Sequence, residues 1–304
     1  MNRYHIAPSG WVPGDDDPFT VDGLYPAGTS CIVLREDDLR TWYGALPNGL
    51  FAFHVHAGAP TVDETVADFI RYENALGRVP IVKLPRGFTG SAFVEDALAR
   101  VPAPSLPRKS DPRWLVHATT TDAWTRVLKD GELRASSELR PEARPDLGSL
   151  YLGEPPEFHE YVMLAAFDSI SPEIVVASQE RGELSEDPDA PYAPGVRMYF
   201  EFRGLLAAGI GVRDGRHTHK VHRRLPLDPH LMASVHASDD GPTLQPGPAG
   251  RRTTGGRSLL DLRQSDAHRT EGDHHADLSP TWTPRTFAGE ANAVFLRWYG
   301  ASSR

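Results

Sequence analysis

The chain has 304 residues, of which 39% are hydrophobic and 24% charged, and its formal net charge is −9. Its 27 glycines and 27 prolines favour many short elements and argue against a helical bundle or a coiled coil. No apolar run is long enough to span a membrane and no apolar leader is evident, so we expect a cytoplasmic protein without a membrane partner. The single cysteine, Cys31, excludes an internal disulfide and a cysteine-rich zinc site.

The charge is spread without the large basic excess that is typical of nucleic-acid binding. One short stretch, residues 213–224, departs from this balance, because five basic side chains and three histidines accompany the single acidic residue Asp214. Such a cluster can hold a phosphate or a pyrophosphate. A solvated basic surface loop is the alternative interpretation.

Residues 1–107 are predicted to form a small α/β domain, and no glycine-rich phosphate-binding loop indicates its role. In the helix expected after the second strand, Thr61 and Glu64 predict a capping box and Gly77 predicts the end. The expected elements are strands at 30–35, 49–57 and 79–85 and helices at 61–77 and 91–101.

Histidines at two positions of one strand, His54 and His56, share a face of that strand. They could be two metal ligands, but no third ligand is evident, so a structural pair is favoured. Two other histidine groups are unsuited to a metal, because the first is too basic and the second lies in a predicted linker; they are His217, His219 and His222, and His274 and His275. No metal site is predicted.

Two segments have the composition of linkers. Residues 101–113 contain four prolines, and residues 237–280 are polar with few aromatic or β-branched side chains, so a linker or a long loop is expected there. Apolar residues then return at helical spacing in residues 281–304, where we expect a helix that docks on the body of the protein. Its apolar face comprises Phe287, Ala291, Val294, Phe295 and Trp298.

Residues 108–236 are predicted to form a second domain that carries the chemistry. An apolar strand ends at His117, Thr121 caps the following helix and Gly131 closes it. The further elements expected are a strand around Tyr151 at 148–153, a helix at 157–168, and strands at 173–178, 196–202 and 219–227.

This order resembles the first half of the ADP-ribosyltransferase fold: His117 is followed by hydroxyl residues, then by a helix ending in LKDGEL, then by a strand with a tyrosine. The stretch from Gly211 to Met232 is similar to the closing strands of the RNA 2′-phosphotransferase branch. The resemblance covers residues 113–236. It implies a split β-sheet domain with flanking helices. Together with the small N-terminal α/β unit expected from the residue pattern, this predicts an α+β protein.

The resemblance also implies roles for individual residues. His117 would bond to the ribose of NAD with Thr119 beside it, and Tyr151 would stack on the nicotinamide. The late glutamate of the classical transferases is missing from the strand at 219–227, which leaves Glu201 as a distant candidate. The phosphotransferase branch holds phosphates with arginines, for which Arg223 and Arg224 are the candidates.

Each of these residues also has a structural interpretation. His117 can be a structural histidine whose hydrogen bonds are all made within the protein, and Tyr151 can be an aromatic residue at the edge of the core. For the threonines after His117, capping the following helix is a sufficient role. Adjacent arginines on a strand face opposite sides, so one of the two can reach a shared site. We expect this one to be Arg223, because it shares a face with Val221 and Leu225.

The leading hypothesis is therefore an NAD-dependent transferase that moves ADP-ribose to a protein, nucleic-acid or small-molecule acceptor and releases nicotinamide. The N-terminal unit would select the acceptor. One alternative is an RNA 2′-phosphotransferase-like enzyme with NAD as the phosphate acceptor, and another is a binding module that kept the fold without the chemistry. The sequence specifies neither the acceptor nor the oligomeric state.

Overall fold

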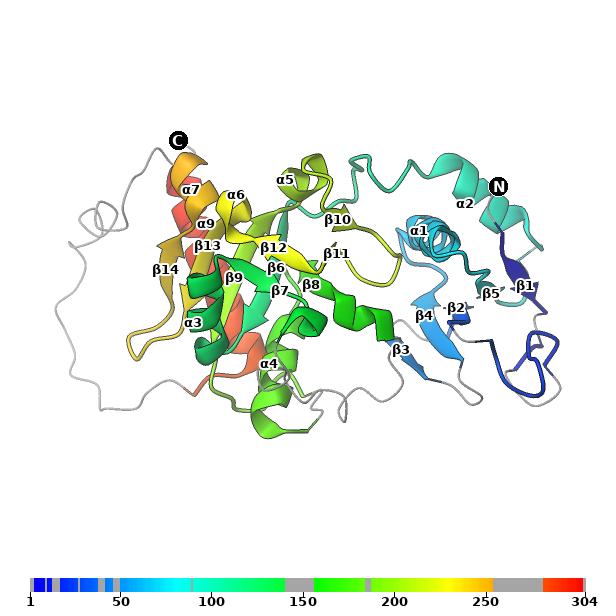
Figure 1. The fold of residues 1–304 in the computed structure, drawn as a ribbon, viewed down its shortest axis with the longest axis horizontal. Helices are drawn as coiled ribbons and strands as arrows, with labels where there is room; N and C mark the ends of the chain where they lie inside the picture. Colours follow the sequence, from blue (N-terminus) through cyan, green and yellow to red (C-terminus); the bar gives the residue numbers. More distant parts are fainter. Residues whose placement is uncertain are drawn as a thin grey trace. The chain divides into compact units, whose positions relative to one another are not determined.

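The computed structural model divides into two compact units, which are described separately (Figure 1). Unit 1 runs to Ser110 and also includes two short segments from later in the chain, Tyr151–Glu160 and Val212–Lys220, and unit 2 contains the rest. Both units mix helices and strands, so the protein is of the α+β class. The structure describes residues 3–8, 10–12, 17–26, 28–37, 42–45, 50–88, 90–139, 156–183, 187–253 and 281–302.

Unit 1 is built on a five-stranded sheet in the order β1-β5-β2-β4-β3. The strands are parallel except for β3, which runs antiparallel to β4. The three strands and two helices expected from the sequence are confirmed, and β1 and β3 are additional. The elements are β1 (His5–Ala7), β2 (Ser30–Arg35), β3 (Trp42–Ala45), β4 (Phe51–His56), α1 (Val62–Ala75), β5 (Ile81–Lys83) and α2 (Ala92–Arg100).

Both faces of this sheet are buried, because neighbouring residues of a continuous apolar strand point to opposite sides. On one face, Ile32 and Phe53 belong to a core that includes Phe69 of α1. On the other face, Cys31 packs in a second core with Trp11 from the segment before β2. The buried position of Cys31 agrees with a structural role for this residue.

The start of α1 differs from the expected capping box. Thr61 occupies the N-cap position, but its side chain caps no backbone N–H. Asp63 and Glu64 lie in the first turn, where carboxylates interact favourably with the positive end of the helix dipole. Gly77 follows the helix at a φ of 77°, as expected for a glycine that ends a helix.

The basic stretch 213–224 is largely buried up to Lys220, so its interpretation as a solvated surface loop is wrong for this part, whereas Arg223 and Arg224 are exposed. Arg213, Arg216 and Lys220 are each less than a tenth exposed. Gly215, at a φ of 73°, lies so close to α1 that a Cβ there would be 2.3 Å from the carbonyl oxygen of Thr65. A glycine is therefore needed for this segment to pack on α1.

Carboxylates compensate the buried cations of this segment. The Asp214 carboxylate lies 2.7 Å from the Lys220 ammonium, and it accepts hydrogen bonds from the backbone N–H groups of Arg216 and His217 at 2.9 and 2.8 Å. Arg216 donates to Glu73 of α1 at 2.6 Å. The Arg216–Glu73 ion pair thus joins the segment to α1, whereas the Asp214–Lys220 pair lies within the segment, and breaking either pair would leave a buried charge without its partner.

Unit 2 contains most of a seven-stranded sheet in the order β10-β11-β8-β6-β9-β13-β14, together with a two-stranded sheet of β7 and β12. Strand β6 is antiparallel to both of its neighbours, β8 and β9. The strands are β6 (Trp114–Thr119), β7 (Glu132–Arg134), β8 (Tyr161–Ala166), β9 (Val196–Glu201), β10 (Gly211–Val212), β11 (His219–His222), β12 (Arg224–Pro226), β13 (Leu231–His236) and β14 (Thr243–Pro246).

The helices of unit 2 cover the two faces of this sheet. Trp124 of α3 belongs to the core on one face, and α9 packs on the other. The docking of α9 is confirmed: Phe287 and Trp298 are buried, and the ring of Phe295 stacks on Tyr199 with 4.1 Å between centroids. The helices are α3 (Thr121–Asp130), α4 (Ser171–Arg181), α5 (Phe202–Ala207), α6 (Leu227–His230), α7 (Pro248–Thr253) and α9 (Pro284–Ser302), none of them, in the described chain, long and apolar enough to cross a bilayer.

Two elements of unit 2 have the opposite type to the one expected. Residues 157–168, expected as a helix, contain a 3-10 turn (Pro156–Glu160) and strand β8. Residues 173–178, expected as a strand, lie inside α4, which has Pro172 in its first turn and Gly182 in a left-handed conformation after its end. Proline at the start and glycine just past the end are the usual helix boundaries, and they outweigh the β-branched content of this run.

Three further expectations need correction. Strand 219–227 is broken into β11 and β12 at Arg223, whose φ is 59°. The predicted linker 237–280 contains β14 and α7, and its residues 254–280 lie outside the described part of the chain. The expected strand at 148–153 lies outside it as well.

Candidate functional site

His117 lies on β6, a central strand of the seven-stranded sheet, and is half-buried. Strand β6 does not end there but continues to Thr119. The Nδ1–H of His117 donates to the carbonyl of Met163 on β8 at 2.9 Å, which orients the ring and leaves Nε2 as an acceptor. Burial lowers the pKa of His117, and the hydrogen bond to Met163 opposes this only in part. The imidazole is therefore neutral at pH 7.

Strand register brings further polar side chains to the face of His117. Met198 of β9 pairs with His117 on one side and with Ser234 of β13 on the other, and cross-strand partners share a face of the sheet. In the same way Val196 pairs with Thr119 and with His236. We call the set His117, Thr119, Ser234 and His236 the histidine face.

The histidine face is ordered by local contacts. The Ser234 hydroxyl lies 3.0 Å from Nε2 of His236. The indole of Trp124 packs edge to face on the His236 ring, with 5.8 Å between the ring centroids. Burial also lowers the pKa of His236. The sequence analysis missed Ser234 and His236, although their alternation with Ala233 and Val235 is the signal of a strand with one polar face.

The threonines after His117 have separate roles. Thr120, and not Thr121, is the N-cap of α3, and its side chain accepts a hydrogen bond from the backbone N–H of Ala123 at 3.2 Å. Thr119 is half-buried at the end of β6 and lies outside this cap. Capping therefore explains Thr120 and leaves Thr119 on the histidine face.

Glu201 is not brought to His117. In the sheet register Glu201 pairs with Trp114, whereas His117 pairs with Met198, so the two positions are about 10 Å apart along the strands. Strand alternation also turns Glu201 to the opposite face from Met198. The structure gives Glu201 the N-cap position of α5.

Arg223 and Arg224 are exposed and face carboxylates. Arg224 donates to Glu138 at 2.7 Å, and Arg223 lies 3.6 Å from the same carboxylate. The expectation that Arg223 points inward with Val221 and Leu225 is wrong, because its side chain is 56% exposed while both apolar residues are buried. The hydrogen bond from Arg224 lowers the pKa of Glu138, which keeps this compensating charge in place.

Tyr151, the candidate for stacking on the nicotinamide, lies outside the described residues. His54 of β4 is buried and His56 half-buried, and among the residues that the structure describes no three potential ligands gather into a metal site.

Comparisons with family models, with curated proteins and with solved structures find no match to this chain. The histidine face is therefore the candidate functional site of unit 2.

The lowered pKa values predict how stability depends on pH. A histidine whose pKa is lower in the folded state binds its proton more readily in the unfolded state, so the stability it contributes is lost as the pH falls below about 6.5. We expect the free energy of unfolding to decrease between pH 7.5 and 5.5. Urea titrations should show a smaller decrease for His117→Gln than for the parent, and an equal decrease would contradict a lowered pKa of His117 in the folded state.

Proposed function

We propose that unit 2 binds NAD and transfers its ADP-ribose to an acceptor, with release of nicotinamide. The observation that carries the proposal is His117: a neutral, oriented histidine on a central strand with a hydroxyl residue two positions later. The order after it also supports the proposal, because α3 ends at Gly131 and Leu133 of β7 is buried. These elements are the first part of the order on which the resemblance to the ADP-ribosyltransferase fold depends; the strand with Tyr151 lies outside the described residues.

The chemistry of the reaction suits these side chains. Breaking the nicotinamide–ribose bond develops positive charge on the ribose, so nearby groups must orient the sugar without adding positive charge. The neutral His117 can accept a hydrogen bond from a ribose hydroxyl through Nε2, because Nδ1 is engaged with Met163. The hydroxyl of Thr119, on the same face, can bond to the same sugar.

The position of Glu201 favours a second candidate function, a module that binds NAD and does not turn it over. A carboxylate that stabilises the ribose cation must lie next to it, and Glu201 is at the other end of the paired strands. The phosphotransferase alternative loses its main support, because the arginines on which it depended, Arg223 and Arg224, face Glu138.

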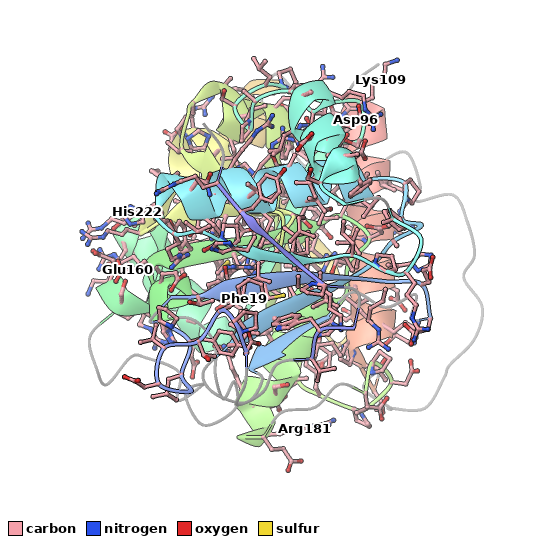
Figure 2. All side chains as sticks on the ribbon, turned by 90° about the vertical axis from the view of Figure 1, so that its right-hand side faces the viewer. Phe19, Asp96, Lys109, Glu160, Arg181 and His222 are labelled. Carbon is pink, nitrogen blue, oxygen red and sulfur yellow. The ribbon has the colours of Figure 1, made fainter. Side chains whose placement is uncertain are left out.

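Replacing His117 by alanine tests the proposal. Misplacing a reacting sugar by about 1 Å can cost about a hundredfold in rate, so nicotinamide release should fall by about that factor. Release is measured by chromatography after incubation with NAD, and circular dichroism checks the fold. The matched control is His222→Ala, since His222 is exposed at the end of β11 (Figure 2) and should leave the rate within about twofold.

Three outcomes separate the candidates. No NAD binding by the parent at millimolar concentration, measured by calorimetry, would overturn both functions. Binding without nicotinamide release would support the binding module. If His117→Ala released nicotinamide as fast as the parent, the reaction would occur at another site.

A further inference from the structure

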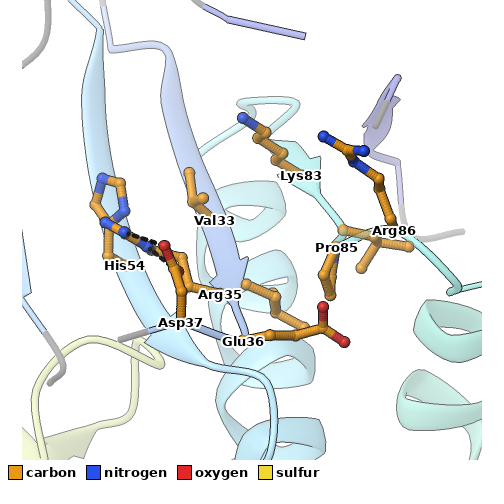
Figure 3. A pocket seen from close by; sticks show the side chains of 10 residues that line it. Val33, Arg35, Glu36, Asp37, His54, Lys83, Pro85 and Arg86 are labelled. Atoms are coloured by element: carbon orange, nitrogen blue, oxygen red, sulfur yellow. Dashed lines mark hydrogen bonds and ion pairs between the residues drawn. The ribbon is translucent and has the colours of Figure 1, made fainter. Parts of the chain in front are cut away.

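Unit 1 contains a cavity of about 440 Å³ that the proposed function does not use (Figure 3). Its walls are the residues at the carboxyl ends of β2 and β5, from Val33 to Asp37 and from Lys83 to Arg86, together with His54 of β4. In open sheets of parallel strands, ligands bind at the carboxyl ends, where the connections of adjacent strands diverge. Here β2 leads towards β3 at one edge of the sheet, whereas β5 leads to α2.

The floor of this pocket is a row of side chains on adjacent strands. Val33 pairs with His54 on one side and with Lys83 on the other, so all three share the face of the sheet that packs on Trp11. The Lys83 ammonium lies 5.9 Å from the ring centroid of Trp11. Trp11 is itself held by its indole N–H, which donates to Asp17 at 2.6 Å. The position of Lys83 is therefore set by two strands and an anchored aromatic ring.

The charges around the pocket are unevenly compensated. Arg35 donates two hydrogen bonds to Asp37, both of 2.9 Å, so this pair is neutral overall. Within the described ranges, neither Lys83 nor Arg86 forms an ion pair with a carboxylate. Figure 3 shows the charged ends of both side chains on the same side of the pocket, with the exposed carboxylate of Glu36 turned elsewhere.

We propose that this pocket binds a small phosphomonoester through Lys83 and Arg86. A phosphomonoester carries close to two negative charges at neutral pH, which two cations that pair with no carboxylate among the described residues can balance. The planar guanidinium of Arg86 can bind two phosphate oxygens at once, and the Lys83 ammonium acts as a point charge. The cavity falls in the range of about 300–1,000 Å³ that is typical of small-molecule sites, and Val33 and Pro85 give the rest of the ligand an apolar surface.

This proposal is independent of the transfer reaction proposed for unit 2. NAD carries a pyrophosphate diester and no phosphomonoester, so the two ligands can be told apart. Binding is measured by calorimetry on the full chain with three probes: adenosine 5′-monophosphate, inorganic phosphate and adenosine. Because no NAD turnover enters this measurement, its failure and a failure of the proposed transferase are separate results.

We expect adenosine 5′-monophosphate to bind, inorganic phosphate to bind more weakly and adenosine not to bind. Affinity should fall with rising salt, because the attraction is between charges in a solvent-accessible pocket. Equal binding of adenosine and its monophosphate would overturn the proposal, and so would binding of inorganic phosphate alone. Absence of binding by all three probes would overturn it too.

Variants that change single charges test whether Lys83 and Arg86 bind the phosphate group. Lys83→Gln and Arg86→Gln should each weaken binding of the monophosphate about tenfold or more, the loss expected for one charge-assisted hydrogen bond. Glu36→Gln should strengthen binding about threefold, because it removes a repelling charge from the rim. The control is Arg100→Gln, which loses one positive charge on α2, where Arg100 is 60% exposed and paired with Asp96 at 2.6 Å.

The expected changes in affinity have opposite directions for Glu36→Gln and for the two cation variants, so the test holds even if one variant is less stable. Glu36 is exposed, so Glu36→Gln should fold like the parent, and melting temperatures verify this for every variant. Unchanged affinity in Lys83→Gln, Arg86→Gln and Glu36→Gln would place the phosphate elsewhere. A loss in Arg100→Gln as large as in Lys83→Gln would show a non-specific effect of charge and would overturn the assignment.

Discussion

Replacing Asp214 by asparagine should lower the free energy of unfolding by about 3–5 kcal/mol, the usual cost of removing one partner from a buried ion pair. Asp214 is fully buried and faces Lys220 at 2.7 Å and His217 at 2.8 Å. The amide keeps the shape of the side chain but not its charge, which leaves the Lys220 ammonium in the interior without its counter-charge. Urea denaturation of the full chain measures this loss in the free energy of unfolding.

The pH dependence provides a second measurement of Asp214. Burial alone would raise its pKa, but His217, Lys220 and Arg216 together hold it well below the usual value. A carboxyl with a lowered folded pKa contributes stability that is present above its unfolded pKa, and this stability is lost as the pH falls through the folded value. The parent should therefore lose stability in strong acid, below about pH 4, more steeply than Asp214→Asn.

The matched control is Asp96→Asn on α2, whose carboxylate is 57% exposed (Figure 2) and should contribute less than about 1 kcal/mol. The double variant Asp214→Leu with Lys220→Met should recover part of the loss, because it removes both charges and keeps the volume. A loss below 1 kcal/mol in Asp214→Asn would contradict a stabilising role for the buried Asp214–Lys220 ion pair within segment 212–220.

Gly195→Ala should destabilise unit 2 by about 1–3 kcal/mol or more, the cost of adding a methyl group to a filled space. A Cβ on Gly195 would lie 1.9 Å from the carbonyl oxygen of Thr119 and 2.7 Å from Cα of Thr120. Both contacts are to backbone, so no side chain can rotate away and the end of β6 must move. Because Thr119 belongs to the histidine face, nicotinamide release should fall together with stability.

The control variant for Gly195→Ala is Gly289→Ala, which should change the free energy of unfolding in the opposite direction. Gly289 is an exposed residue of α9 with open space around its Cβ position, and alanine there should stabilise the helix by about 0.5–1 kcal/mol. Melting temperatures of the two variants should therefore move in opposite directions. A Gly195→Ala protein as stable as the parent would show that β6 can move at this point without cost.

Elements whose signal is local can be predicted from the amino-acid sequence alone. The apolar run at 30–35, the helix that Gly77 ends and the apolar face of α9 depend on spacing within a few residues, and the structure contains all three. His117 could also be singled out from the sequence, because a polar residue at the end of an apolar strand stands out from its neighbours. The same local signal placed Gly131 after α3.

Other features depend on contacts between residues that are distant in the sequence, and only the folded structure shows them. Short apolar runs such as 161–166 and 173–178 fit either a helix or a strand, and pairing of β8 with β6 decides the first. The register of β13 with β9 adds Ser234 and His236 to His117, although they are more than a hundred residues later in the chain.

The charged residues show the same division. The sequence shows five basic side chains at 213–224, but only the structure shows which of them are buried. Arg216 can pair with Glu73 only once the segment packs on α1, whereas Arg223 and Arg224 remain exposed. The row of Val33, His54 and Lys83 likewise requires three strands in one register. A single sequence specifies which side chains are present, and pairing between distant segments decides which of them share a site.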